Sequence, residues 1–451
     1  MPLIPCPIAQ WAREYPEGIA LVTPDKELTY AQLDQSISQW CSIFEKKEIK
    51  EGEVIALALP TSIETVEILW ALFRVGAIAF MLNPHFPEQT LRRYALEAGA
   101  KTLISITDID SLAQEKTGFS TTFYSLALKQ WATYLLTSGT SGKPKIAVHT
   151  LANYYYNALG ATTEIPLLVT DRWFLSLPLY HVGGLGILFR VFLSGAAIVM
   201  TPKAPLETTI SRFNITHASW VPTQLYRALK TPGFSYEPFS TLKAILIGGA
   251  PLNDSLALKG YEVGFPLYPT YGLTEMTSQV TVAKPGALHV GHPLGYRNLQ
   301  ITNTSEIWVK GHTLFQGYLD QGLCTLPLNE EGWFFTGDLG QTDAEGNLHI
   351  QGRQDQLFIS GGENIQPEEI EAALLEIDSI CQAMVLPIED PEFGKRPIAY
   401  VQTLNSDSWT PALFIEKLKE TLPAYKIPIA IHPWPETPLG GIKPSRAEMI
   451  L

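Results

Sequence analysis

The sequence predicts an α/β fold in which a large N-terminal domain of α/β layers is followed by a small α+β C-terminal domain. A chain of 451 residues is too long for one ordinary hydrophobic core. Strand-like and helix-like patterns alternate through roughly the first three hundred residues, which indicates a largely parallel sheet flanked by helices. After about Gly311 the strands become shorter and turns more frequent.

The clearest βαβ unit lies near the N-terminus. Val54–Leu59 is typical of a buried strand, and Ala77–Leu82 is typical of the next one. Between them, Thr61 and Glu64 have the spacing of a capping box, which predicts a helix that runs to Gly76. Ala244–Ile247, which precedes two glycines, repeats the strand pattern later in the chain.

The C-terminal part begins at a predicted boundary, Gly352-Arg-Gln-Asp355. Before it, Asp343–Asn347 has turn chemistry. After it, Pro367–Leu375 is expected to be a helix, because acidic residues in its first turn suit the positive end of the helix dipole. We expect domains at 1–352 and 357–451, joined by 353–356.

Composition excludes several classes of protein. The apolar fraction of 46% and charged fraction of 17% are typical of a globular protein with a large interior. The formal charge of −13 argues against a nucleic-acid-binding surface, which would be basic. The stretch Gly183–Met200 is apolar but contains Arg190 and Gly195, so it predicts a buried element and no membrane span.

Cysteine usage and the N-terminus favour a cytoplasmic protein. The N-terminal residues contain three prolines and no basic region, so we expect no signal peptide. The four cysteines have no paired spacing, which indicates neither a zinc site nor a disulfide framework. They are Cys6, Cys41, Cys324 and Cys381.

A run rich in glycine and hydroxyl residues, Thr137-Ser-Gly-Thr-Ser-Gly-Lys-Pro-Lys145, predicts a phosphate-binding loop. Glycines let backbone N–H groups approach phosphate oxygens, hydroxyls donate hydrogen bonds and lysine supplies charge. The run lies between two strand-like segments, Tyr134–Leu136 and Ile146–His149. Its glycines are three apart and no helix follows at once, so it is not a Walker A motif. A flexible surface turn is the alternative.

This loop resembles the phosphate loop of the adenylate-forming superfamily, which includes acyl-CoA ligases, luciferases and the adenylation domains of peptide synthetases. Ser141 stands where that superfamily usually has threonine, and it keeps the hydroxyl. The resemblance continues in motif order along essentially the whole chain. The further matching segments are Gly248-Gly-Ala250, Tyr271-Gly-Leu-Thr-Glu275, Thr336-Gly-Asp338, Gly352-Arg-Gln-Asp355, Ser360-Gly-Gly-Glu-Asn364 and Gly440-Gly-Ile-Lys-Pro-Ser-Arg446.

The resemblance implies a fold whose small C-terminal domain rotates about a hinge, and it assigns a role to each motif. Mg²⁺ would bind Glu275, consistent with its preference for oxygen ligands. Lys443 would contact the carboxylate and the α-phosphate, and Asp355 would be the hinge. The implied ATP-binding residues are Thr137, Ser138, Gly139, Thr140, Ser141, Gly142 and Lys145 at the phosphates, Gly248, Gly249, Ala250, Tyr271 and Gly272 at the adenine, Thr274 at phosphate, and Asp338 and Arg353 at the ribose.

The implied chemistry is adenylation followed by thiol transfer. A carboxylate would attack the α-phosphorus of MgATP and expel pyrophosphate, and the thiol of CoA would then attack the acyl-adenylate. The work of the protein is to align anions that repel one another and to neutralise developing charge. After rotation, Gly361 and Gly362 would form part of a second face that admits the thiol.

Three segments resemble more specifically the o-succinylbenzoate–CoA ligases of menaquinone biosynthesis: Ser176–Leu185, Ala218–Leu225 and Thr274–Gln279. The implied substrate is an aromatic dicarboxylic acid, activated at its succinyl carboxyl. Its second carboxylate needs a cationic anchor, and Arg190 in an apolar run is a candidate, with a structural salt bridge as the alternative.

Three further residues are assigned to the acyl pocket. Ser219 and Thr277 are expected to line it. His181 is similar to the residue that helps gate the pocket in this family, and a packed core histidine is the alternative. We therefore expect small-molecule partners, no nucleic acid and no stable membrane insertion. The sequence leaves open whether the chain forms a homo-oligomer.

Two other functions stay open at this point. One is another aryl or medium-chain carboxylate–CoA ligase, or a ligase that delivers to a separate carrier protein. The other, from a different class, is a non-catalytic nucleotide-binding relative, which would predict damage to Glu275, Arg353 or Lys443. All three residues are present.

Overall fold

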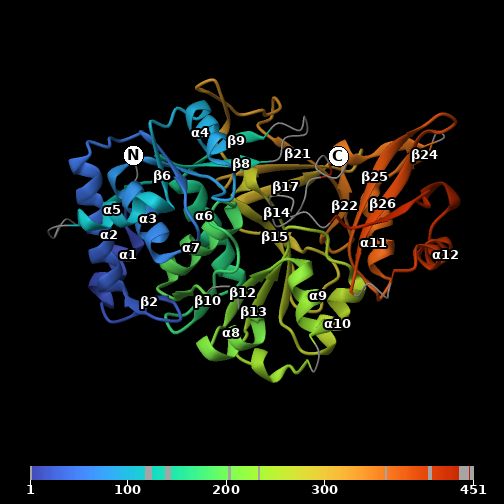
Figure 1. Ribbon diagram of the computed structural model, residues 1–451, viewed down its shortest axis with the longest axis horizontal. Coiled ribbons are helices and arrows are strands. Elements are labelled where there is room, and N and C mark those ends of the chain that lie inside the picture. Colours follow the sequence, from blue (N-terminus) through green and yellow to red (C-terminus); the bar gives the residue numbers. More distant parts are fainter. Residues whose placement is uncertain are drawn as a thin grey trace.

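The computed structural model describes residues 3–116, 124–137, 144–201, 205–231, 234–360, 363–404, 409–435 and 446. Figure 1 shows a large N-terminal body and a smaller body formed by the C-terminal residues at one end of it. Within the described residues, the large body contains three larger sheets and one two-stranded pair, and the small body has a three-stranded sheet, a two-stranded pair and helices of its own.

Two large sheets form the frame of the N-terminal body. The seven-stranded sheet has the order β20-β19-β9-β8-β5-β4-β6. Its strands are β4 (Val54–Ala58), β5 (Ile78–Met81), β6 (Thr102–Ser105), β8 (Trp131–Thr137), β9 (Lys145–Thr150), β19 (Gly317–Asp320) and β20 (Leu323–Thr325). Strands β6, β4, β5 and β8 are parallel, whereas β8, β9, β19 and β20 are antiparallel. The predicted parallel sheet is therefore partly correct. Short connections make β8–β9 and β19–β20 antiparallel, and β9 and β19 pair antiparallel although they are far apart in the sequence.

The nine-stranded sheet has the order β16-β15-β14-β13-β12-β10-β11-β2-β3. Its central pairs, from β2 to β14, are parallel, and both edges are antiparallel. Its strands are β2 (Ile19–Val22), β3 (Glu27–Thr29), β10 (Arg172–Phe174), β11 (Ala197–Val199), β12 (His217–Trp220), β13 (Ala244–Ile247), β14 (Leu267–Leu273), β15 (Ser278–Val282) and β16 (His292–Pro293).

Helices pack between these sheets and on their outer faces. The largest hydrophobic cluster joins residues of α2, α3 and α7 to strands of both sheets, so these helices lie in the interior between them. The helices are α1 (Pro7–Glu14), α2 (Tyr30–Lys46), α3 (Ile63–Val75), α4 (Glu88–Glu97), α5 (Ile106–Gln114), α6 (Leu151–Glu164), α7 (Val182–Ser194), α8 (Leu206–Phe213), α9 (Pro222–Lys230) and α10 (Asp254–Glu262).

The predicted βαβ unit is present as β4-α3-β5, with one correction at the helix start. The N-cap is Ser62, whose hydroxyl accepts a hydrogen bond from the Thr65 N–H at 3.2 Å. The predicted cap at Thr61 is wrong by one residue, because Ser62 is the residue with extended backbone dihedrals immediately before the helix. The helix ends as predicted at Gly76, which has the left-handed conformation that glycine favours.

The apolar stretch Gly183–Met200 is a buried element, as predicted. It forms most of α7, the buried interior helix, and then β11. Within the described ranges, no helix combines the length and hydropathy needed to cross a bilayer. Cys6, Cys41, Cys324 and Cys381 are all free thiols.

The third sheet and the C-terminal body complete the fold. The third sheet is antiparallel, with strands β17 (Arg297–Ile301), β18 (Glu306–Gly311), β21 (Phe334–Thr342) and β22 (Leu348–Arg353). The C-terminal body contains β23 (Phe358–Ser360), β24 (Glu363–Ile365), α11 (Pro367–Leu375), β25 (Ile380–Asp390), β26 (Gly394–Thr403), α12 (Pro411–Thr421) and β27 (Ile431–Pro433). A separate hydrophobic cluster, from Phe358 to Ile431, gives this body its own core. Strands β1 (Leu3–Pro5) and β7 (Ser125–Ala127) pair with each other.

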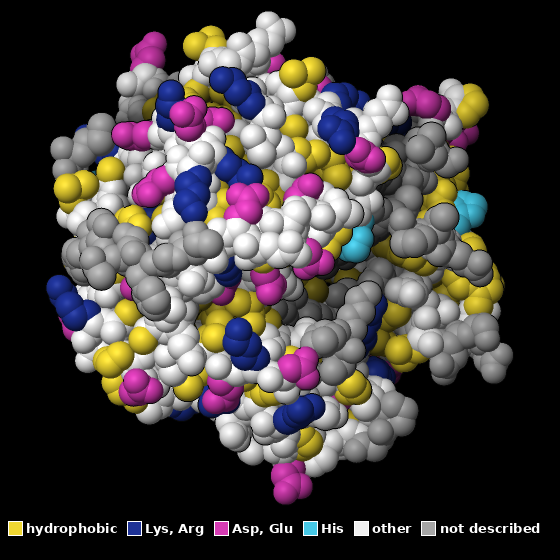
Figure 2. All heavy atoms as spheres, turned by 60° about the vertical axis from the view of Figure 1, so that its left-hand side comes forward, with side chains coloured by type: hydrophobic (Ala, Val, Ile, Leu, Met, Phe, Trp, Pro, Cys, Tyr) yellow, Lys and Arg dark blue, Asp and Glu magenta, His cyan; other side chains and the backbone are white. Residues whose placement is uncertain are grey.

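The surface carries charges of both signs. On the face drawn in Figure 2, basic and acidic side chains of the described residues alternate over most of the large body. Such interspersed charge gives this face no extended cationic track.

Candidate active site

One hydrogen-bonded chain joins three of the predicted nucleotide-binding residues. The Tyr271 hydroxyl donates to Asp338 Oδ2 at 2.5 Å, and Arg353 Nη1 donates to Asp338 Oδ1 at 3.1 Å. Tyr271 lies on β14 and reaches the third sheet. There, Asp338 on β21 is paired with Arg353 on β22. Burial raises the pKa of Tyr271, so its hydroxyl stays a donor at neutral pH.

The same arginine reaches the predicted hinge residue. Arg353 Nε and Nη2 each donate to the Asp355 carboxylate at 3.0 Å, a bidentate pair. Burial raises the pKa of Asp338, and the neighbouring Arg353 charge opposes that rise. The sequence motifs at Tyr271, Asp338, Arg353 and Asp355 therefore form one polar network.

Glu275 contacts β19 through Tyr318, a residue that also lies beside Lys145. Its Oε1 accepts a hydrogen bond from the Tyr318 hydroxyl at 2.6 Å. The Nζ atom of Lys145, the last residue of the predicted phosphate loop, lies 4.7 Å from the centre of the Tyr318 ring. Tyr318 thus connects two predicted site residues. Sequence reasoning missed it, since nothing in Gly317-Tyr-Leu-Asp320 signals that β19 pairs with β9.

The Thr274–Glu275 turn rests on a buried histidine. His149 on β9 lies 2.7 Å, through its Nε2, from the Thr274 carbonyl oxygen. A carbonyl only accepts, so Nε2 carries the proton and Nδ1 is unprotonated. His149 is fully buried, and burial lowers its pKa to about 4. This neutral histidine holds the predicted phosphate-contacting turn against the strand that follows the phosphate loop.

We expect stability to fall in mild acid because of His149. Its folded-state pKa of about 4 lies below the ordinary value of 6.5, so the unfolded chain takes up the proton first as the pH falls. The stabilisation is complete above about pH 6.5 and declines toward pH 4, by up to about 3 kcal/mol. The measurement is urea unfolding at several pH values for the wild type and His149→Gln, whose amide keeps a donor.

The variant should show a shallower decline over this range. His292→Gln, at an exposed histidine, is the matched control and should follow the wild type. Identical pH profiles for the wild type and His149→Gln would contradict the buried neutral state.

Glycines in the predicted adenine segments sit where a side chain does not fit. A Cβ on Gly272 would lie 2.0 Å from the Ser278 carbonyl oxygen, across a β-bulge at Tyr271 and Gly272. A Cβ on Gly248 would lie 2.7 Å from the Thr270 carbonyl oxygen. Gly249 has a φ of +76°, which favours glycine. Ala250 follows in the half-buried turn after β13.

The predicted carboxylate anchor is a buried cation that has no acidic partner among the described residues. Arg190 on α7 is 2% exposed, its Nη2 donates to Gln279 Oε1, and its guanidinium lies 4.8 Å from the centre of the Trp173 ring. Its Nε has no hydrogen-bond partner within the described structure. Burial lowers its pKa to about 10. The alternative, a structural salt bridge, finds no acidic partner in the described ranges.

The three other acyl-pocket candidates differ in their surroundings. His181 is exposed as the N-cap of α7 and lies against Tyr180, with ring centroids 4.7 Å apart, so it is not a packed core histidine. Ser219 is buried at the end of β12, and its carbonyl accepts from the Ser176 hydroxyl at 2.5 Å. The Thr277 hydroxyl donates to the Thr313 carbonyl at 2.8 Å, and the side chain is fully buried.

Part of the predicted site lies outside the described residues. Thr137 and Lys145 are described and pair across β8 and β9, so the loop does connect two strands, as predicted. The residues outside the described ranges are Ser138, Gly139, Thr140, Ser141, Gly142, Gly361, Gly362 and Lys443.

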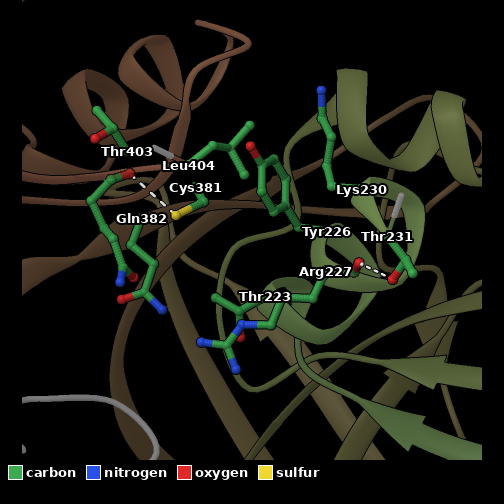
Figure 3. Close-up of a pocket in the computed structure, with 10 residues that line it drawn as sticks. Thr223, Tyr226, Arg227, Lys230, Thr231, Cys381, Gln382, Thr403 and Leu404 are labelled. Atoms are coloured by element: carbon green, nitrogen blue, oxygen red, sulfur yellow. Dashed lines mark hydrogen bonds between the residues drawn. The ribbon is translucent and has the colours of Figure 1, made fainter. Parts of the chain in front are cut away.

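A separate cavity of about 270 Å³ lies between the two bodies, at α9 and strands β25 and β26. Figure 3 shows Tyr226 and Arg227 from α9 facing Cys381 and Gln382 across it. None of the predicted nucleotide or acyl residues lines this cavity, so it is not part of the candidate site.

Comparison with known families agrees with this geometry. A model of the AMP-binding enzyme family matches residues 8–319, and a model of the AMP-binding enzyme C-terminal domain matches residues 369–441. This chain belongs to the AMP-binding enzyme family. Its fold is the adenylate-forming fold, with a large N-terminal and a small C-terminal domain.

Individual relatives in the AMP-binding enzyme family are similar over nearly the full length. The 2-succinylbenzoate–CoA ligase of Salmonella typhimurium is 34% identical, covering 98% of this chain and 96% of that protein. The o-succinylbenzoate CoA synthetase from Bacillus subtilis, in complex with ATP and magnesium ion, has a TM-score of 0.88 at 28% identity and covers 100% of both chains. The same enzyme with the acyl-adenylate intermediate OSB-AMP has a TM-score of 0.87 at 28% identity, covering 98% of this chain and 96% of that one.

Proposed function

We propose that this AMP-binding enzyme is an AMP-forming acid–thiol ligase that activates 2-succinylbenzoate with ATP and transfers the acyl group to CoA. The observation that carries the choice of acid is Arg190, a buried guanidinium to which the described part of the chain supplies no carboxylate. An uncompensated buried charge is costly, and a substrate carboxylate would offset that cost. Relatives with this activity are similar over almost the whole chain.

The described residues suit a nucleotide in ways that follow from their own chemistry. Asp338 retains acceptor capacity for ribose hydroxyls, and Arg353 holds it in place. His149 orients the Thr274 backbone, and at Gly248 and Gly272 the backbone of Thr270 and Ser278 approaches so closely that no side chain fits. The phosphates are assigned to the loop from Thr137 to Lys145.

Glu275 is the residue that would hold Mg²⁺. Its Oε1 is oriented by Tyr318, and its Oε2 has no hydrogen bond within the described structure, so one carboxylate oxygen is open to a cation. No cluster of three or more acidic, histidine or cysteine ligands occurs in the described ranges. One protein carboxylate fits Mg²⁺, which usually takes its remaining ligands from phosphates and water. When bound there, the ion neutralises charge on the phosphates.

Domain rotation is the second part of the proposal. We assign 1–352 to the nucleotide- and acyl-binding domain, 353–356 to the hinge with Asp355 as pivot, and 357–451 to the mobile domain that carries Lys443. Contacts between the two bodies include the ion pair of Lys259 and Asp378 at 2.8 Å, and both side chains are largely exposed. Such exposed pairs contribute little and would separate readily.

The test is pyrophosphate release with MgATP and CoA across a panel of acids. The panel contains 2-succinylbenzoate, benzoylpropionate, benzoate and a medium-chain fatty acid. We expect the highest kcat/KM with 2-succinylbenzoate, and replacement of CoA by a carrier protein should not support turnover. Turnover of benzoate or the fatty acid with none for 2-succinylbenzoate would overturn the choice of acid, and no turnover at all would favour a non-catalytic relative.

Replacing Arg190 should affect the dicarboxylate selectively. Arg190→Met removes the cation and keeps an apolar side chain of similar length, so KM for 2-succinylbenzoate should rise about a hundredfold. KM for benzoylpropionate, the same keto acid without the ring carboxylate, should change little. Arg190→Lys should fall between them. Arg212→Met, at an exposed arginine, is the control, and equal KM changes for both acids would contradict the anchor role.

A further inference from the structure

A second buried arginine lies beside the proposed anchor. Arg297 begins β17 and is 4% exposed. Its Nη1 donates to the Gly295 carbonyl at 3.3 Å and its Nη2 to the Asn157 carbonyl at 3.2 Å. Its Nε has no partner within the described structure. Like Arg190, it is a buried cation for which the described residues supply no carboxylate.

A continuous set of hydrogen bonds connects the two arginines. Asn157 on α6 accepts from Arg297 through its carbonyl, and its side-chain Nδ2 donates to the Gln279 carbonyl at 3.2 Å. Gln279 Oε1 in turn accepts from Arg190. We call Arg190, Asn157, Gln279 and Arg297 the guanidinium cluster.

The guanidinium cluster has unmet hydrogen-bonding capacity. Its buried atoms that have no hydrogen-bond partner within the described structure are Arg190 Nε, Arg297 Nε and Asn157 Oδ1. Burial and then the charge of Arg190 lower the pKa of Arg297 to about 9. The two cations therefore interact through the low-dielectric interior, where an added anion would stabilise both.

The backbone nearby makes room for Arg297. A Cβ on Gly160 would lie 2.8 Å from Arg297 Nη1 and 2.5 Å from the Gly295 carbonyl oxygen. Gly160 on α6 thus permits the guanidinium to reach the helix and the Asn157 carbonyl. A glycine inside a helix costs about 1 kcal/mol relative to alanine, so its presence is explained by this close approach.

We propose that Arg297 is a specificity-determining positioning residue which, with Arg190, selects acids that carry a second carboxylate. This inference rests on the proposed function and extends it. The bound carboxylate contacts Arg190, and Arg297 acts through the guanidinium cluster: its charge adds to the attraction, and its bond to Asn157 fixes Gln279 and hence the Arg190 guanidinium. Monocarboxylic acids gain nothing from either effect.

The test separates acid recognition from folding. For Arg297→Met, Arg297→Lys and the wild type, KM and kcat are measured with 2-succinylbenzoate and with benzoylpropionate, together with KM for ATP and the melting temperature. We expect Arg297→Met to raise KM for 2-succinylbenzoate about tenfold, with kcat, KM for ATP and KM for benzoylpropionate within about twofold of wild type. Arg297→Lys should recover most of the loss.

A second variant keeps the inference testable if Arg297→Met does not fold. Asn157→Asp is nearly isosteric and introduces a carboxylate into the guanidinium cluster, so it should compete with the substrate carboxylate. It should raise KM for 2-succinylbenzoate and leave KM for benzoylpropionate unchanged. Unchanged KM for the dicarboxylate, or equal rises for both acids, would overturn the role of Arg297.

The outcome is distinguishable from failure of the proposed function. If the wild type does not turn over 2-succinylbenzoate, the proposed function itself is wrong. If the wild type turns it over and Arg190→Met discriminates between the two acids while Arg297→Met does not, only the role of Arg297 is wrong.

Discussion

Glu275→Gln is expected to lower kcat/KM for ATP by about a hundredfold to a thousandfold. The amide keeps the size of the side chain and can still accept from Tyr318, but it removes the negative charge that would hold Mg²⁺. Losing the charge stabilisation that a metal ion supplies raises the activation free energy by several kcal/mol. Each 1.36 kcal/mol lowers the rate about tenfold. The measurement is steady-state pyrophosphate release over a range of Mg²⁺ concentrations.

The Mg²⁺ dependence distinguishes a metal ligand from a structural residue. In Glu275→Gln, half-maximal activity should require more Mg²⁺, whereas Tyr318→Phe, which loses only the hydroxyl that orients the carboxylate, should show a smaller shift in the same direction. Glu164→Gln, at an exposed carboxylate, is the control. An unchanged Mg²⁺ requirement in Glu275→Gln would remove Glu275 from the metal site.

Arg353→Met is the second change with a large expected effect. It breaks the ion pair with Asp338, which is 9% exposed, and the bidentate pair with Asp355. Among the described residues, the Asp338 carboxylate would keep only the Tyr271 hydroxyl as a partner, and an underpaired buried carboxylate costs on the order of 2 kcal/mol. We expect a lower free energy of unfolding and a KM for ATP raised about tenfold or more.

A matched control isolates the effect of burial. Arg92 also pairs with a carboxylate, Glu88, at 2.6 Å, but both side chains are about 70% exposed. Arg92→Met should therefore change the free energy of unfolding by less than about 0.5 kcal/mol and leave KM for ATP unchanged. Equal stability changes in the two variants would show that the Arg353 network contributes nothing beyond a surface pair.

Elements with strong local patterns were predictable from the sequence. The strands β4 and β13 and the helix α11 occur where the apolar runs and the acidic first turn predict them. The position of the predicted phosphate loop between two strands was also predicted, because two apolar runs flank it, whereas the antiparallel pairing of these strands was not. The helix cap at Ser62 was misplaced by one residue, since the cap depends on backbone dihedrals that residue types alone do not specify.

The candidate site was only partly predictable. Motif resemblance identified Tyr271, Asp338, Arg353 and Asp355 one by one, and the structure brings these four into one network. The supporting residues His149 and Tyr318 were missed as site residues. Each touches a partner from a distant segment, Thr274 in one case and Glu275 in the other, and no local pattern encodes such a pairing.

The sequence by itself determined the alternation of strands and helices and the position of the predicted phosphate loop between two strands, and both depend on short-range periodicity and residue chemistry. The expected nucleotide-binding role of each motif comes from the resemblance to the adenylate-forming superfamily. Only the tertiary structure decided that Arg190 has no acidic partner in the described ranges and that Arg297 lies in the same cluster. Whether a buried charge is compensated depends on which distant side chains the fold packs around it, and packing is a property of the whole chain.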